Sequence, residues 1–226
     1  MEKYIEDISE LNLAEEINRG SCSSIYRLDS LLLFKFFNED YRDLSDSINL
    51  EFLDTISTIS SISDLHFVAR GIDVYRSSSE LFGYTMKEIN ASKLDEVSDD
   101  ALVFDIILGF EKLKTDIRRL SDNYVKTEDI GGDNILYNGN MYLLDLDLSL
   151  VNKGYVPDEL YFLTRQNVFR CVFDRITGCK FKDMVSNDDY FEYCNKIIDF
   201  TANAVGYYPK TVSEFKGAYQ KTIGLQ

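Results

Sequence analysis

The chain of 226 residues is short of the residue types that build linkers and metal sites. It has only two prolines and 12 glycines, and no low-complexity or repeated segment divides it. Its one histidine, His66, stands apart from four scattered cysteines, and no two cysteines form a C-x-x-C pair. This pattern argues against a structural zinc site, which needs closely spaced ligands. The four cysteines are Cys22, Cys171, Cys179 and Cys194.

Long hydrophobic runs are also missing. No segment approaches 18 uninterrupted apolar residues, and residues 1–7 lack the basic start and apolar run of a signal peptide. We therefore predict a protein with no signal peptide and no membrane span. A reducing cytoplasm, of its own cell or of a host cell, fits this reading.

Basic residues are few: 24 Lys and Arg stand against 39 Asp and Glu, which gives a formal net charge of −15. Such a chain repels polyphosphate backbones, and no basic stripe offsets the repulsion, so nucleic acid is not expected as a partner. The acidity is read mainly as a solubility feature. An anionic small ligand would need a metal ion and one or two well-placed lysines.

Apolar material, in contrast, is plentiful. Hydrophobic residues make up 45% of the chain, and 15 Phe and 15 Tyr are among them. This is enough for a real core, in one large domain or in two small lobes that share a cleft. Residues 13–37 read as three strands joined by turns. Ser45 then precedes a predicted helix whose apolar residues recur at helical spacing, namely Ile48, Phe52, Ile56 and Ile59.

The rest of the chain changes from strands to helices. Segments 67–75 and 81–89 read as strands, and a long amphipathic helix begins near Ser98. Asn138-Gly139, between two apolar runs, predicts a β-hairpin. Two further helices are expected at 158–178 and 188–205. We therefore predict a single α+β domain over 1–226, sheet-rich in 1–89 and with a hinge and helical part in 90–226.

Three polar residues flank the predicted hairpin. Asn134 lies at one end and Asp145 at the other, so folding of the hairpin should bring the two side chains together. An amide oxygen beside a carboxylate suits Mg²⁺. Asp129 lies five residues before Asn134 on the loop that leads to the same place, where its carboxylate could accept a hydroxyl proton.

This pattern resembles the catalytic loop and metal motif of the protein-kinase-like superfamily. The resemblance extends upstream in the same order along the chain. Asn18–Tyr26 looks like an eroded glycine-rich loop, and Leu33–Phe36 like the strand that bears the phosphate-binding lysine. Glu51 looks like the ion-pair partner of that lysine, and Tyr84–Ile89 like the last strand before the adenine-binding hinge.

The resemblance implies a two-lobed protein-kinase-like fold, with ATP and Mg²⁺ as cofactors. Lys35, held by Glu51, would grip the nucleotide phosphates, Asn134 and Asp145 would hold Mg²⁺, and Asp129 would be the catalytic base. The nucleotide-binding residues implied are Gly20, Ser21, Ser23, Ile25, Lys35, Glu51, Met86, Glu88 and Asn90. The implied reaction is phosphoryl transfer to a hydroxyl, with Ser or Thr of a protein substrate as the first choice.

The chain departs from the family pattern in several places. Thr127-Glu128 replaces the usual His-Arg before the catalytic aspartate, and Gly131 stands where many members have a cation. The segment from Asp145 to the next helix is only about a dozen residues long, which resembles minimal effector kinases, atypical kinases and antibiotic phosphotransferases. Asp147 is a rival to Asp145, because the two residues alternate in any extended stretch.

Plainer interpretations remain open for the same residues. The aspartates around Gly131 could cap turns, Asp145 could be an ordinary strand exit, and Glu51 could be solvated on its helix. Two other functions also remain open: an aminoglycoside- or choline-type small-molecule kinase, and a pseudokinase that acts as a binding module. The acidic surface would attract the cationic substrates of the former.

Overall fold

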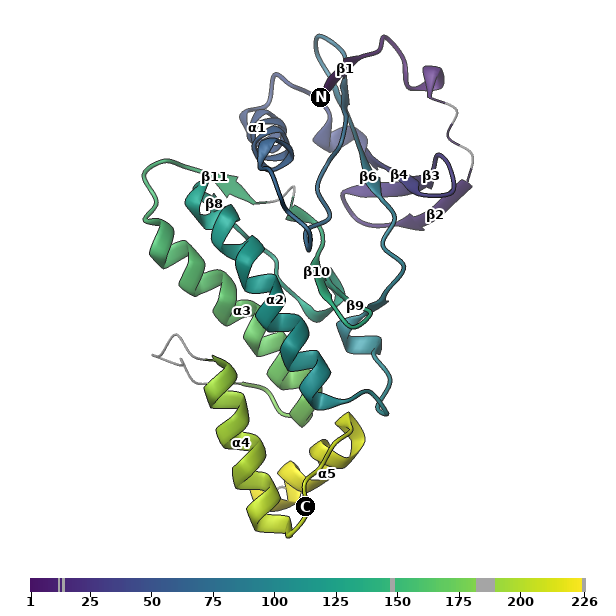
Figure 1. The fold of residues 1–226 in the computed structure, drawn as a ribbon. Coiled ribbons are helices and arrows are strands. Elements are labelled where there is room, and N and C mark those ends of the chain that lie inside the picture. Colours follow the sequence, from purple (N-terminus) through teal and green to yellow (C-terminus); the bar gives the residue numbers. More distant parts are fainter. Residues whose placement is uncertain (12, 14, 147–148, 182–189, 225–226) are drawn as a thin grey trace.

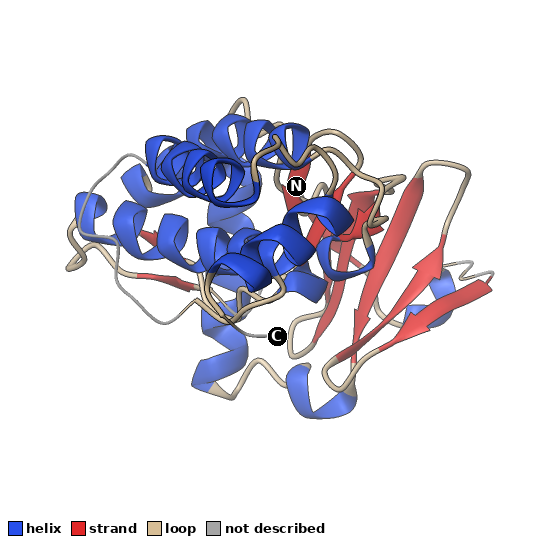
Figure 2. Ribbon diagram, turned by 90° about the horizontal axis from the view of Figure 1, so that it is seen from below, coloured by secondary structure: helices blue, strands red, loops and turns tan. Residues whose placement is uncertain are grey.

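The computed structural model describes the whole chain except residues 12, 14, 147–148, 182–189 and 225–226. It is a mixed α+β protein, as the sequence predicts. The first part of the chain forms a six-stranded sheet. Figure 1 shows this part of the chain above the long helices of the second part. Figure 2, seen from below, shows the helices gathered on one side and the strands of this sheet on the other.

The large sheet has the order β1-β5-β6-β4-β3-β2, with β1 and β5 parallel and the other neighbours antiparallel. The strands predicted within 13–37 are confirmed, and β1 was not predicted. The strands are β1 (Glu2–Tyr4), β2 (Glu15–Arg19), β3 (Ser23–Arg27), β4 (Leu32–Phe37), β5 (Val74–Arg76) and β6 (Leu81–Lys87).

The strand predicted at 67–75 is mostly wrong, because β5 takes up only its end. The earlier part of the segment runs beside a hairpin of the helical part of the chain. The amide of Ala69 donates to the carbonyl of Leu143 at 2.9 Å, and Val68 bridges the same residue. This segment therefore joins the sheet to the helical part.

Helix α1 (Ser47–Ser61) packs against the sheet (Figure 1). Phe52 stacks near Phe37 and Tyr41, with ring centroids 6.5 and 6.0 Å apart. The N-cap of α1 is Asp46, whose carboxylate accepts a hydrogen bond from the amide of Ile48 at 2.8 Å. The predicted cap, Ser45, lies one residue too early. Ile48 is 57% exposed, although it was placed in the apolar stripe.

The second part of the chain packs around α2 (Val103–Asp122) and α3 (Pro157–Thr177). The helix predicted from Ser98 starts five residues later, after a turn, whereas the predicted stop at Gly178 is confirmed by its left-handed φ of 69°. α4 (Tyr190–Val205) matches the last predicted helix, except that residues 188–189 lie outside the described residues. The apolar faces of these helices form the larger core cluster.

The predicted hairpin is confirmed. β9 (Ile135–Tyr137) and β10 (Met141–Leu143) pair antiparallel around Gly139, and β7 (Ser92–Lys93) pairs with the other edge of β9. β8 (Val125–Lys126) and β11 (Leu150–Val151) form a separate two-stranded ladder. The chain between β8 and β11 therefore runs as a loop, a hairpin and a return, which brings both ends of the hairpin close to the loop.

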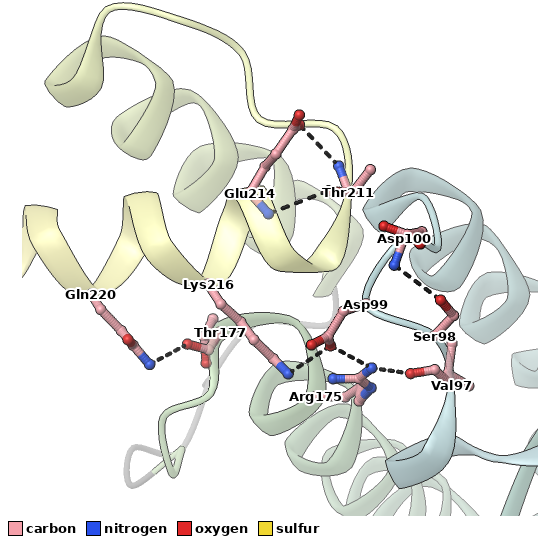
Figure 3. Close-up of polar contacts among 10 residues, drawn as sticks. All are labelled: Val97, Ser98, Asp99, Asp100, Arg175, Thr177, Thr211, Glu214, Lys216 and Gln220. Atoms are coloured by element: carbon pink, nitrogen blue, oxygen red, sulfur yellow. Dashed lines mark hydrogen bonds and ion pairs between the residues drawn. The ribbon is translucent and has the colours of Figure 1, made fainter.

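Helix α5 (Val212–Thr222), which was not predicted, packs against α3 and α4. Figure 3 shows the start of α5 and its polar contacts. Thr211 and Glu214 form a capping box at its start. Asp99 accepts from Arg175 of α3 at 2.8 Å and from Lys216 of α5 at 3.2 Å, so one carboxylate joins two helices to the segment before α2. None of the described helices is long and apolar enough to cross a lipid bilayer.

Candidate functional site

Lys35 lies in β4, where the strand crosses the middle of the sheet. Its side chain is almost fully buried, and its Nζ lies 2.9 Å from a carboxylate oxygen of Asp145. Gly83, the neighbour of Phe36 in β6, has a φ of +151°, and a side chain there would collide with the carbonyl of Lys35. The glycine thus lets β6 approach the lysine strand closely.

The hairpin brings its two flanking residues together, as the sequence predicts. The amide of Leu144 donates to the carbonyl of Asn134 at 2.9 Å, so Asp145 follows directly beside the asparagine. The side-chain amide of Asn134 donates to the carbonyl of Asp129 at 2.9 Å, and lies 3.5 Å from its carboxylate. The loop aspartate, the asparagine and the second aspartate therefore form one group.

Asp129 and Asp145 share an uncommon backbone conformation. Their φ angles are +52° and +53°, and they are two of only four non-glycine residues with positive φ in the described part of the chain. Aspartate tolerates this region better than most residues, yet the conformation still costs of order 1 kcal/mol. A strained backbone at both carboxylates is typical of a functional site.

A cavity of about 640 Å³ lies between the large sheet and the hairpin, and it is within the size range of ligand pockets. Most of the residues expected at the nucleotide line it. They are Gly20, Ser23, Ile25, Lys35, Met86, Glu88, Asn134 and Asp145. The other four expected residues, Ser21, Glu51, Asn90 and Asp129, do not line it.

Apolar side chains that were not predicted form the two walls of this cavity. Ile17 and Leu33 project from the sheet, and Leu136 and Leu144 from the hairpin, with Ala69 beside them. Apolar lining of this kind suits an aromatic ring. The sequence did not single out these apolar residues, because the same residue types are expected in the core of any sheet.

The chain that leaves β6, residues 87–91 and called the hinge from here on, offers unbonded peptide groups to the cavity. Ile89 and Ala91 line it, and neither backbone forms a hydrogen bond to another described residue. The carbonyl of Asn90 instead accepts from the side chain of Asn138 at 3.0 Å. The Glu88 carboxylate is held by Arg27 at 2.6 and 2.7 Å, which lowers the pKa of Glu88. The Ile89 backbone lies within the stretch from Glu88 to Asn90 whose backbone the resemblance implies would bond adenine, and Ala91 lies one residue beyond it.

The predicted phosphate loop is closed on itself. The amide of Gly20 donates to the carbonyl of Ser23 at 2.8 Å, and the side chain of Asn38 donates to the carbonyl of Ser21 at 2.7 Å. Ser23 is buried and lines the cavity, while the side chain of Ser21 lies outside it. The loop therefore forms a firm edge of the cavity.

Glu51 is exposed on α1 and lines a different, smaller cavity with Asp54 and Tyr155. Its neighbour on the helix, Thr55, is the buried polar residue: its hydroxyl donates to the carbonyl of Ser149 at 2.9 Å. Thr55, and not Glu51, therefore connects α1 to the chain that follows the site. Asp147, the rival of Asp145, lies outside the described residues.

The loop that carries Asp129 contacts two side chains of α3. The hydroxyls of Thr127 and Thr164 lie 2.6 Å apart, and both residues are buried. The Cys171 thiol lies 3.8 Å from the carbonyl of Ile130, and burial raises the pKa of this thiol to about 11, so it packs as a neutral group. A side chain on Gly132 would meet the carboxylate of Asp95, which would have to move aside.

The residues present fit Mg²⁺ in its usual setting with a phosphate ligand. Among the described residues, no three His, Cys, Asp or Glu side chains gather into a metal-holding group. Mg²⁺ beside phosphates, however, needs only one or two protein carboxylates, because phosphate oxygens and water complete its octahedron. Asp145 and the oxygen of the Asn134 amide, whose nitrogen is already engaged, could supply two ligands.

Similarity to other proteins does not assign this site. No protein-family model matches the chain, and no curated protein matches it significantly. The functional argument therefore depends on the arrangement of the chain's own side chains.

Proposed function

We propose that the chain is an ATP-dependent phosphotransferase with a two-lobed, protein-kinase-like single domain, which transfers phosphate to a Ser or Thr hydroxyl of a protein. The observation that carries the proposal is the ion pair between Lys35 and Asp145 at the wall of the large cavity. It joins a cation that could bind phosphate to a carboxylate that could bind Mg²⁺, across two segments far apart in the chain.

The two ends of the cavity support a nucleotide as the ligand. Lys35 pairs across the sheet with Tyr84, and the free peptide groups of Ile89 follow five residues later. At the rise of a strand the two features are roughly 15 Å apart. A ring bound at the hinge and phosphates bound at the lysine would fit this separation, with the apolar walls on the faces of the ring.

In this mechanism the protein contributes position and charge. Lys35 would hold the phosphates, Asn134 and Asp145 would hold Mg²⁺, and Asp129 would accept a hydrogen bond from the acceptor hydroxyl and take its proton. The bound Mg²⁺ would neutralise charge on the transferred group. The left-handed backbone at both aspartates and the Asn134 bond to Asp129 keep these groups in register.

Two other outcomes have support from particular residues. The Glu96 and Asp133 carboxylates line the same cavity, which favours a cationic small acceptor of the aminoglycoside or choline type. The exposed position of Glu51, together with Gly131, favours a nucleotide-binding module with weak catalysis.

The deciding experiment uses ATP labelled on its γ-phosphate, with Mg²⁺, the purified chain and a cell lysate. We expect labelled protein bands that disappear with Asp145→Ala. Label on an added aminoglycoside or amino alcohol alone would identify the small-molecule kinase. ATP·Mg²⁺ that raises the melting temperature without any transfer would identify the binding module. If ATP·Mg²⁺ neither raises the melting temperature nor leads to any transfer of label, nucleotide binding is refuted.

A further inference from the structure

A second cavity, of about 570 Å³, lies behind the hinge. One side of it is formed by the segment 65–72 and the other by the hinge residues 87–90, with Asn138 and Tyr142 of the hairpin region between them. It shares Ala69 and the hinge residues 87–89 with the first cavity. The hinge chain is therefore the partition between two separate spaces.

The second cavity is cationic in a strongly acidic chain. Arg70, Lys87 and His66 line it, and neither Arg70 nor Lys87 forms an ion pair with any residue that the structure describes. The one carboxylate among the lining residues, Glu88, is already neutralised by Arg27. In a chain with a net charge of −15, two uncompensated cations at one cavity leave a local site for an anion.

The lining also has apolar and neutral polar side chains, and one wall of it is fixed by hydrogen bonds. Leu65, Val68, Ile72 and Tyr142 supply the apolar surface. The wall that carries His66 is fixed from α2, because the buried carboxylate of Asp116 accepts the backbone amides of His66 and Phe67 at 2.7 and 2.5 Å. A preformed site loses little conformational entropy when a ligand binds.

We propose that this second cavity binds a small aromatic anion, such as an aromatic carboxylate or sulfonate. The apolar side chains contact the ring system, and Arg70 and Lys87 hold the acid group. The proposal does not depend on the proposed transferase activity, because the cations and apolar residues that carry it do not include the predicted catalytic or metal-binding residues.

The test compares two fluorescent probes of nearly the same shape. 8-Anilinonaphthalene-1-sulfonate carries the acid group, and N-phenyl-1-naphthylamine lacks it. With the whole folded chain, we expect saturable binding of the sulfonate and about tenfold weaker binding of the neutral probe. This difference corresponds to the loss of one charge-assisted hydrogen bond. Equal affinity for the two probes would overturn the anion site.

Variants locate the bound probe. We expect Arg70→Gln to raise the Kd for the sulfonate about tenfold, and the exposed Lys87→Gln to raise it several-fold. Lys93→Gln is the matched control, because Lys93 is exposed, has no ion pair to a described residue, and lines only the first cavity. The control should bind as the wild type does.

Two results would overturn the proposal. The first is an unchanged Kd for the sulfonate in Lys87→Gln. Arg70→Gln loses a hydrogen bond to the carbonyl of Ile62 and could be unstable. Lys87→Gln is expected to fold normally, so it still tests the site in that case. The second is a loss of binding in Lys93→Gln equal to that in Arg70→Gln, since this would assign the probe to the first cavity.

Discussion

The charge of Lys35 is held where water barely reaches it. Its side chain is only 5% exposed, whereas that of its partner Asp145 is 47% exposed. Removing an ammonium group from water is costly, and the ion pair with Asp145 offsets part of that cost. A buried lysine charge at the wall of a cavity is a candidate functional group.

This view predicts opposite effects of Lys35→Met on stability and binding. The melting temperature should stay the same or rise, because replacing a buried charge by an apolar side chain of similar length is often neutral or stabilising. The rise in melting temperature on adding ATP·Mg²⁺, expected for the wild type, should disappear. Differential scanning fluorimetry with and without the nucleotide measures both, and an undiminished shift would remove Lys35 from the phosphate site.

The hydroxyl pair of Thr127 and Thr164 should position Asp129, because it fixes the loop two residues before this aspartate. If the proposed function holds, Thr127→Val should lower the rate of phosphoryl transfer about tenfold or more with little change in KM, since small misplacement of a base is costly. Thr127→Ser keeps the hydroxyl and should restore most of the rate. A lowered rate that serine does not rescue, together with a lowered melting temperature, would indicate a general folding defect instead.

The sequence predicted Asn134 beside Asp145 for a physical reason, because a short hairpin leaves no other arrangement for its ends. The prediction for Glu51 depended on the rotation of α1, which the apolar residues did not define. The buried face of that helix includes the polar Asn49 and Thr55 and leaves Ile48 exposed. The rest of the predicted stripe, Phe52, Ile56 and Ile59, is buried, so the apolar residues located the buried face but did not show that Glu51 lies outside it.

At the scale of elements, Asp116 of α2 does more than fill the core. Its carboxylate is fully buried, accepts two backbone amides of the segment 65–72, and lies 3.1 Å from Arg119. The segment has no regular structure of its own at these residues, so its backbone groups depend on this side chain. Both cavities use Ala69 of the same segment, so its placement affects both.

We expect Asp116→Ala to lower the free energy of unfolding by about 3 kcal/mol, because two buried amides and one guanidinium lose their acceptor. Asp122→Ala is the control on the same helix. Its carboxylate is 53% exposed and pairs with Arg118 at the surface, so its loss should cost less than about 1 kcal/mol. Urea denaturation of both variants measures the difference, and equal values would contradict the anchoring role.

Elements with local signals were predicted well, and those that depend on distant partners were not. The hairpin follows from Asn138-Gly139, and the end of α3 from Gly178. The two-residue strands β8 and β11 exist only because each pairs with the other. Residues 67–69 bond to the hairpin instead of extending β5, and Ile72 and Asp73 bond to Thr85 of β6. Helix α5 was missed although Thr211 and Glu214 carry the capping-box pattern that marks its start.

At the scale of the whole molecule, one carboxylate connects parts of the helical region that are far apart in the sequence. Asp99, before α2, binds Arg175 of α3 and Lys216 of α5 (Figure 3). Arg175 also donates to the carbonyl of Val97 and is almost fully buried. In a chain with a net charge of −15, such bonds between anions and the few cations offset the self-repulsion of the folded state.

The last prediction concerns the pH dependence of this connection. The hydrogen bond from Arg175, followed by that from Lys216, lowers the pKa of Asp99 below its ordinary value of 3.8. The folded state therefore binds the ionised form more strongly, so the stabilisation is fully present above about pH 4 to 5 and is lost as the pH falls through the lowered pKa. Thermal unfolding of Asp99→Asn should show a lower melting temperature than the wild type at pH 7.

The difference in melting temperature between Asp99→Asn and the wild type should shrink as the pH falls below about 4. It should vanish once the pH is below the lowered pKa of Asp99, because the wild-type carboxylate is then protonated as well. Asp100→Asn is the control. Asp100 is the next residue in the chain, and its carboxylate is exposed and forms no ion pair with a described residue. It should differ little from the wild type at any pH. A difference for Asp99→Asn that stays constant from pH 7 to pH 3 would mean that its shape, and not its charge, holds α3 and α5 together.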